Sequence, residues 1–121
     1  TPIEKARVQR WLSVASGELA KGPAALRLEY VFGANIDVAS ALAITENLLK
    51  VMEDTLTDTK SYLATDSLTL GDIAMYSYIA HAPEGGVSLQ PYPAIRAWVN
   101  RIESLANFIP MASSPIMECR L

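Results

Sequence analysis

The 121-residue sequence contains one cysteine, Cys119, and one histidine, His81. A single cysteine cannot form an internal disulfide, and these two residues fall short of the three or four ligands of a usual zinc site. We therefore expect neither a disulfide framework nor a metal centre. A reduced, cytoplasmic setting is the default expectation for such a chain.

The sequence also lacks a strong excess of one charge and any long apolar run. It has 10 Lys and Arg against 13 Asp and Glu, a formal net charge of −3, and its basic residues are scattered. Because the sequence has no run of basic residues that could bind along a phosphate backbone, nucleic acid is not an expected partner. The apolar runs are far shorter than the roughly 20 residues of a membrane span, and no charged-then-apolar leader opens the chain. Neither membrane insertion nor secretion is expected.

Apolar residues are plentiful. They make up 50% of the sequence, against 19% charged residues, a balance that excludes intrinsic disorder. The length corresponds to a single domain over residues 1–121. A chain of this size can bury a core without metal or disulfide support.

Strand signals are nearly absent, and Pro and Gly divide the sequence into helical stretches. Asn35 is the expected N-cap of the third stretch, with Asp37 in its first turn. Residues 57–61 are expected to be a polar linker, and the tail from residue 107 looks irregular. The helices are expected at about residues 3–20, 24–31, 36–56 and 70–82. A last helix is expected to begin at Pro93 and to carry Leu105 on its inward face.

The stretch from residue 70 has the clearest start signal. Thr69 and Asp72 have the spacing of a capping box, and Leu68 and Ile73 are placed for a hydrophobic staple around it. Asp72 is the single charged residue of an otherwise nearly apolar helix, which is typical of the centre of a bundle. The sequence therefore predicts an all-α fold, a bundle of about five helices around a buried central helix.

Several segments together resemble a known family. Leu-Thr-Leu-Gly-Asp-Ile-Ala at 68–74 resembles the start of the central helix of the glutathione transferase C-terminal domain, although Gly71 stands where the family usually has Ala. Tyr-Pro-Ala-Ile-Arg-Ala-Trp at 92–98 resembles a later helix of that domain, and His-Ala-Pro-Glu-Gly-Gly-Val at 81–87 is similar to many bacterial members. Trp11-Leu12 and residues 21–25 resemble the domain's first helix and its end.

The resemblance implies an enzyme that conjugates glutathione to electrophiles in detoxification and works as a homodimer. It also implies an N-terminal thioredoxin-like domain, which binds most of the glutathione and activates its thiol. No βαβ pattern occurs in this chain, so we expect it to be the C-terminal domain alone, without a catalytic residue and inactive by itself. Its expected contribution is the hydrophobic-substrate wall and part of the dimer interface.

A second interpretation belongs to another class of protein. The same helical domain resembles pieces of translation factors and aminoacyl-tRNA synthetases, where it docks partners without catalysis. The chain would then be a non-catalytic protein-interaction module. The His81 to Val87 segment favours the enzyme.

The resemblance also implies substrate-binding residues. His81 aligns with an aromatic residue that lines the pocket, so it either contacts substrate or, alternatively, interacts with the last carbonyls of its helix. Ser13 matches an Asn that reaches the partner subunit's glutathione, and Lys21 matches a Lys beside the pocket. The alternatives are a Ser bonded to its own backbone and a solvated Lys.

Arg27 and Tyr30 are placed to face the cleft or the dimer partner, with a solvated Arg and a core Tyr as the alternatives. Thr69 and Asp72 are assigned to structural capping. Cys119 is interpreted as incidental, because no helix N-terminus or basic partner is evident to lower the pKa of its thiol.

Overall fold

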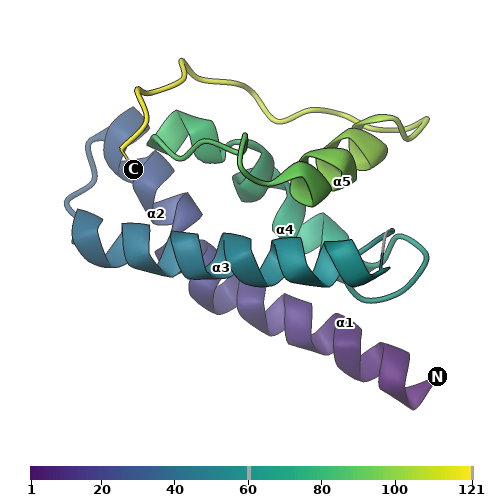
Figure 1. Cartoon of the computed structure of the whole chain (residues 1–121). Coiled ribbons are helices and arrows are strands. Elements are labelled where there is room, and N and C mark those ends of the chain that lie inside the picture. Colours follow the sequence, from purple (N-terminus) through teal and green to yellow (C-terminus); the bar gives the residue numbers. More distant parts are fainter. Residues whose placement is uncertain (60, 121) are drawn as a thin grey trace.

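The computed structural model describes residues 1–59 and 61–120, and this part of the chain is helical without strands. The expected all-α bundle is confirmed (Figure 1). The helices are α1 (Pro2–Val14), α2 (Pro23–Phe32), α3 (Val38–Thr59), α4 (Leu70–Ala80) and α5 (Pro93–Glu103), with a π-helical turn η1 (Ala15–Leu19) and a 3-10 turn η2 (Ala82–Gly85).

The core forms where the helices cross. Helix α1 packs against α4, α3 against α5, and α2 against η2, and Figure 1 shows α4 lying behind the long α3. The largest fully buried side chains are Trp11, Trp98, Leu26, Leu49, Met52, Met75, Ile79 and Ile95. Both tryptophans are therefore core residues, as their periodicity predicts.

Two predicted boundaries of α3 were wrong. Asp37, not Asn35, is the N-cap of the helix, because the Ser40 amide donates to Asp37 Oδ1 at 3.1 Å and the Ala41 amide donates to the Asp37 carbonyl at 3.0 Å. The helix continues to Thr59, through residues expected to be a linker. The Thr57 hydroxyl donates to the Glu53 carbonyl at 2.7 Å, so a polar side chain is satisfied within the helix. The last part of the expected linker includes Lys60, which lies outside the described residues.

Helix α4 is buried on most sides, and it presents one side to solvent. Gly71, Asp72, Met75, Tyr76 and Ile79 are buried, whereas Leu70 is 63% exposed and Ile73 58% exposed. The helix ends at Ala80 rather than at residue 82, since Pro83 lacks the amide that would continue it. Leu105 lies beyond the end of α5 and is 38% exposed, so the prediction that it faces inward was wrong.

The tail after α5 has no regular structure, as expected, but it contacts the helices at several separate points. Figure 1 shows it in yellow, running back from α5 to α2. Phe108 packs edge-on against Tyr76, with ring centroids 5.4 Å apart. The Met117 amide donates to the Pro83 carbonyl at 3.2 Å, and the Arg120 amide donates to the Gly86 carbonyl at 2.8 Å. Arg120 also forms an ion pair with Glu29.

In the described part of the chain, no helix combines the length and the apolar character needed to cross a membrane.

Candidate functional site

The docked tail encloses three hollows against the helices. The first, here the His81 hollow, measures about 310 Å³ and lies between the end of α4, η2 and the tail; its polar lining residues include Tyr76, His81, Glu84, Glu103, Ser113 and Ser114. The second, here the apolar hollow, measures about 540 Å³. The two share Tyr76 and Met111, so they adjoin.

A buried cluster of three side chains lies at one side of the His81 hollow, which His81 and Glu84 line. Arg27 of α2 donates from Nε to Glu84 Oε1 at 2.9 Å. His81 Nδ1 contacts the other carboxylate oxygen, Glu84 Oε2. All three side chains are nearly buried, with 6% of Glu84 exposed and 11% of Arg27 and of His81. Arg27 reaches the tail as well, donating from Nη2 to Ser114 Oγ at 3.4 Å.

The surroundings of Glu84 keep it ionised. Burial by itself would raise the pKa of its carboxyl group, but the hydrogen bonds from His81 and Arg27, together with their charges, outweigh burial and hold the pKa below its ordinary value. Glu84 is therefore a charged acceptor at neutral pH, oriented from both sides. No role was predicted for Glu84 from the sequence, although an acid three residues after the single histidine was a usable signal.

Tyr76 separates the two hollows. Its hydroxyl donates a hydrogen bond to Glu103 Oε2. Burial, followed by this hydrogen bond and the nearby negative charge, raises the pKa of Tyr76 far above its ordinary value. The phenol therefore stays protonated at any physiological pH and acts as a donor to Glu103.

The apolar hollow is suited to a hydrocarbon or aromatic group. Phe108 and Ile109 of the tail face it, and Leu68 and Ile73, the residues expected to form a hydrophobic staple, line it too. Its other apolar side chains are Ile102, Leu105 and Met111. Burial of apolar ligand surface there gains roughly 25 cal/mol per Å² before the costs of binding.

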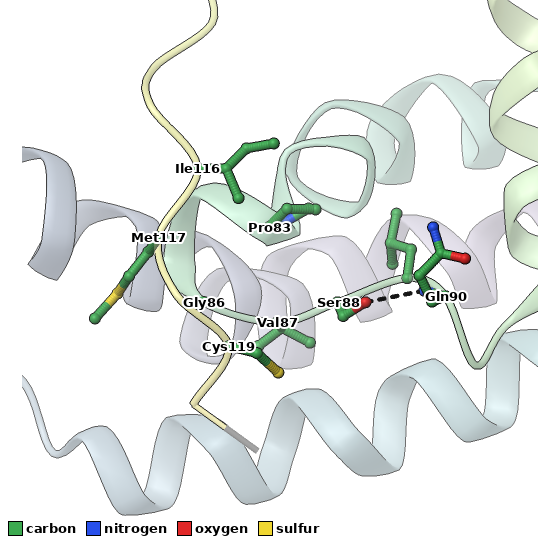
Figure 2. A pocket seen from close by; sticks show the side chains of 9 residues that line it. Pro83, Gly86, Val87, Ser88, Gln90, Ile116, Met117 and Cys119 are labelled. Carbon is green, nitrogen blue, oxygen red and sulfur yellow. Dashed lines mark hydrogen bonds between the residues drawn. The ribbon is translucent and has the colours of Figure 1, made fainter.

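The third hollow shares Pro83 and Ile116 with the His81 hollow and is drawn in Figure 2. It measures about 370 Å³ and is lined by the strand-like connection after η2 and by tail residues that include Ile116, Met117 and Cys119. Cys119 is exposed at its edge. Polar groups here are few, and Ser88 Oγ accepts from the Gln90 amide at 3.1 Å.

The structure brings together some of the residues predicted to bind substrate and separates others. His81 and Arg27 meet at Glu84. Ser13 and Lys21 are exposed on the first helical stretch and its end, and neither lines the His81 hollow or the apolar hollow. Tyr30 is 45% exposed, so the alternative of a core tyrosine was wrong. Arg27 is buried and ion-paired, so the alternative of a solvated arginine was wrong too.

Thr69 and Asp72 lie in capping-box geometry at the start of α4. Asp72 Oδ2 accepts from the Thr69 amide at 2.9 Å and from its hydroxyl at 3.2 Å. The other oxygen, Oδ1, accepts from the Leu63 amide and from Trp98 Nε1, each at 2.9 Å. Asp72 is fully buried, and all of its hydrogen-bond partners are backbone or side-chain groups of this domain. The carboxylate therefore holds together α4, α5 and the segment before α4.

No group of three or more His, Cys, Asp or Glu residues among the described ones is arranged to hold a metal ion.

Comparison with known proteins identifies the fold. The family model for the glutathione S-transferase C-terminal domain matches residues 7–106. The chain therefore belongs to the glutathione S-transferase family, as its C-terminal helical domain. The resemblance stated from the sequence is confirmed.

Solved structures agree with this assignment. A glutathione S-transferase from Pseudomonas fluorescens superposes with a TM-score of 0.83 at 27% identity, over 91% of this chain and 57% of that one. A possible glutathione S-transferase from Rhodopseudomonas palustris gives 0.81 at 25%, over 99% and 56%. A glutathione S-transferase from Xanthobacter autotrophicus gives 0.82 at 24%, over 88% and 54%, and supports the fold. The chain thus spans little more than half the length of these proteins. No curated protein sequence matches it.

Proposed function

We propose that this chain is the C-terminal domain of a glutathione transferase that joins glutathione to electrophiles. The observation that carries the proposal is the likeness to the Pseudomonas fluorescens glutathione S-transferase over 91% of the chain. That protein is much longer, since the match covers 57% of it. We propose that an N-terminal thioredoxin-like domain supplies the remainder here too, and binds and activates glutathione.

In this proposal the helical domain contributes the wall against which the electrophile lies. The apolar hollow offers the hydrocarbon surface, and His81 offers a polar contact at the neighbouring hollow. An apolar wall matters because the thiolate must meet the electrophile in a defined orientation, and positioning contributes much of the rate of such a reaction. Tyr30 and Arg27 of α2, and the exposed Ser13 and Lys21, are proposed to contact glutathione, substrate or a partner subunit of a cytoplasmic homodimer.

The experiment compares the isolated chain with the protein encoded by the complete reading frame. The isolated chain should show no glutathione binding by calorimetry at millimolar concentration, because the thiol-activating domain is separate from it. The complete protein should conjugate glutathione to chlorodinitrobenzene. Tight glutathione binding by the isolated chain would contradict the assignment of glutathione binding to a separate N-terminal domain. A synthetase or translation-factor domain in the reading frame would contradict the enzyme and support an interaction module.

Within the complete protein, His81→Ala tests the substrate wall. We expect the KM for the electrophile to change more than the KM for glutathione, since His81 lines the electrophile's side of the site. Unchanged kinetics with several electrophiles would return His81 to a purely structural role.

A further inference from the structure

We propose that Glu84 is a positioning residue that fixes His81 as the Nδ1–H tautomer, so that Nε2 acts as a hydrogen-bond acceptor for an uncharged, hydroxyl-bearing aromatic ligand in the His81 hollow. The inference rests on the proposed function in taking this hollow as part of the electrophile's site. The assignment of the tautomer stands on the buried cluster alone.

The hydrogen bond between His81 and Glu84 has a defined donor. An ionised carboxylate has no proton to give and acts only as an acceptor. Glu84 Oε2 contacts His81 Nδ1, so Nδ1 must carry the hydrogen. In the neutral ring, Nε2 then has the lone pair, because one nitrogen of a neutral imidazole donates and the other accepts.

The cluster holds Glu84 rigidly against His81. Glu84 is held from its other side by Arg27 Nε at 2.9 Å, and Arg27 always carries its proton. The carboxylate therefore cannot rotate away from His81 without also disturbing its ion pair with the buried guanidinium of Arg27. With Nδ1 engaged and the ring lining the hollow, Nε2 is the nitrogen that remains for a ligand.

The lining of the hollow defines the class of ligand. Besides His81, the polar groups of the hollow include Glu103, which already accepts the Tyr76 hydroxyl. Glu84 is neutralised by Arg27, so Glu103 leaves a negative charge at the hollow, which disfavours anions. The adjoining apolar hollow accommodates a ring. A neutral aromatic compound with one hydroxyl donor matches both.

The experiment uses the fact that His81 is the single histidine of the chain. Long-range proton–nitrogen NMR spectra, recorded above the midpoint of the ring's titration, report which nitrogen is protonated. In the unmodified chain we expect the Nδ1–H form. In Glu84→Gln we expect the Nε2–H form, because the amide oxygen must serve Arg27 and the amide NH₂ then faces Nδ1.

Glu29→Gln is the matched control. It removes the same charge from the comparable Glu29–Arg120 pair, and we expect it to leave the His81 tautomer unchanged. If Glu84→Gln does not fold, the spectrum of the unmodified chain still decides. An Nε2–H ring there would overturn the proposal, as would a Glu84→Gln spectrum identical to it.

The ligand class is tested with phenol and anisole, which differ in that anisole has no hydroxyl donor. Phenol should shift the His81 ring signals and bind roughly two- to tenfold more tightly than anisole, the difference expected for one hydrogen bond. Equal binding, or no shift of His81 with either compound, would overturn the assignment of Nε2 as the ligand's acceptor. Failure of the complete protein to conjugate glutathione would instead contradict the proposed function, and leaves the tautomer result unaffected.

Discussion

A single carboxylate, that of Asp72, organises the centre of this domain. It is fully buried, yet it accepts hydrogen bonds from the Thr69 amide and hydroxyl, the Leu63 amide and the Trp98 indole. A buried charge is tolerated when donors surround it in this way. The residue that most invites a catalytic interpretation from its sequence is therefore engaged entirely with its own fold.

Asp72→Ala should destabilise the domain by at least about 3 kcal/mol, since each buried donor left without an acceptor costs roughly 1–3 kcal/mol. Urea unfolding followed by circular dichroism measures this loss. The exposed Asp66 of the segment before α4 provides the control, and Asp66→Ala should stay within about 0.5 kcal/mol of the unmodified chain. An Asp72 variant that keeps its stability, but abolishes turnover in the complete protein, would show that the residue is catalytic.

At the scale of elements, the helices are positioned by close backbone contacts and by caps supplied from distant residues. Helix α1 lies so near α4 that a Cβ atom on the buried Gly71 would stand 3.0 Å from Trp11 Cβ. The glycine that departs from the family's usual alanine thus lies where a side chain has little room. Gly71 costs about 0.5–1 kcal/mol in helix propensity, and the close packing of α4 on Trp11 offsets this cost.

Helix α5 is capped by a residue far away in the sequence. Glu53 of α3 accepts the Ala94 amide at Oε2, 2.9 Å away, and the Ile95 amide at Oε1, 3.0 Å away. Pro93 has no amide, and the Arg96 amide donates to the Tyr92 carbonyl at 3.0 Å. Every amide of the first turn is thereby satisfied, and a negative charge lies at the positive end of the helix dipole.

Glu53→Ala should therefore cost about 1–2 kcal/mol, in the range of other N-cap losses. Native-state hydrogen exchange should accelerate at the Ala94 and Ile95 amides in particular. Glu46→Ala, at an exposed position of the same helix, serves as the control for a lost charge. Equal protection of the two amides in both variants would contradict the cap.

At the scale of the whole molecule, the Arg27–Glu84–His81 cluster joins segments that are distant in the sequence. It links α2 to η2, and Arg27 extends the link to Ser114 of the tail. The tail is held again at Gly86 and Glu29 by Arg120. The charged carboxylate of Glu84 therefore joins α2 to η2 and His81, whereas the tail is held by further contacts of its own at Met117 and Arg120.

The sign of the resulting pH dependence follows from Glu84. Its pKa is lower in the folded state than the ordinary value of 4.5, so its stabilising contribution is complete above that value. The contribution is lost as the pH falls through the depressed folded pKa. The unfolding free energy of the unmodified chain should exceed that of Glu84→Gln at neutral pH, and the difference should shrink below pH 4.5. A difference that is constant with pH would contradict the charged role of Glu84.

Much of this architecture was predictable because it depends on interactions within one or two helical turns. Pro and Gly residues marked the ends of the helices in the sequence, and Gly33, with φ of 71°, ends α2. The Thr69–Asp72 pair was visible because its partners are three residues apart. Errors at Asp37 and Thr57 were also local, since Asn and Asp are equally good caps and Thr can bond within a helix.

The helical class, the family and the local start of α4 were therefore predictable from the sequence. The tertiary structure decided which distant groups meet: Glu84 with Arg27, 57 residues apart, and Glu53 with Ala94, 41 residues apart. With 13 acidic and 10 basic side chains available, charge alone does not select such pairs. Selection comes from helix packing and from the docked tail, which bury particular polar groups and bring each of them within reach of particular partners.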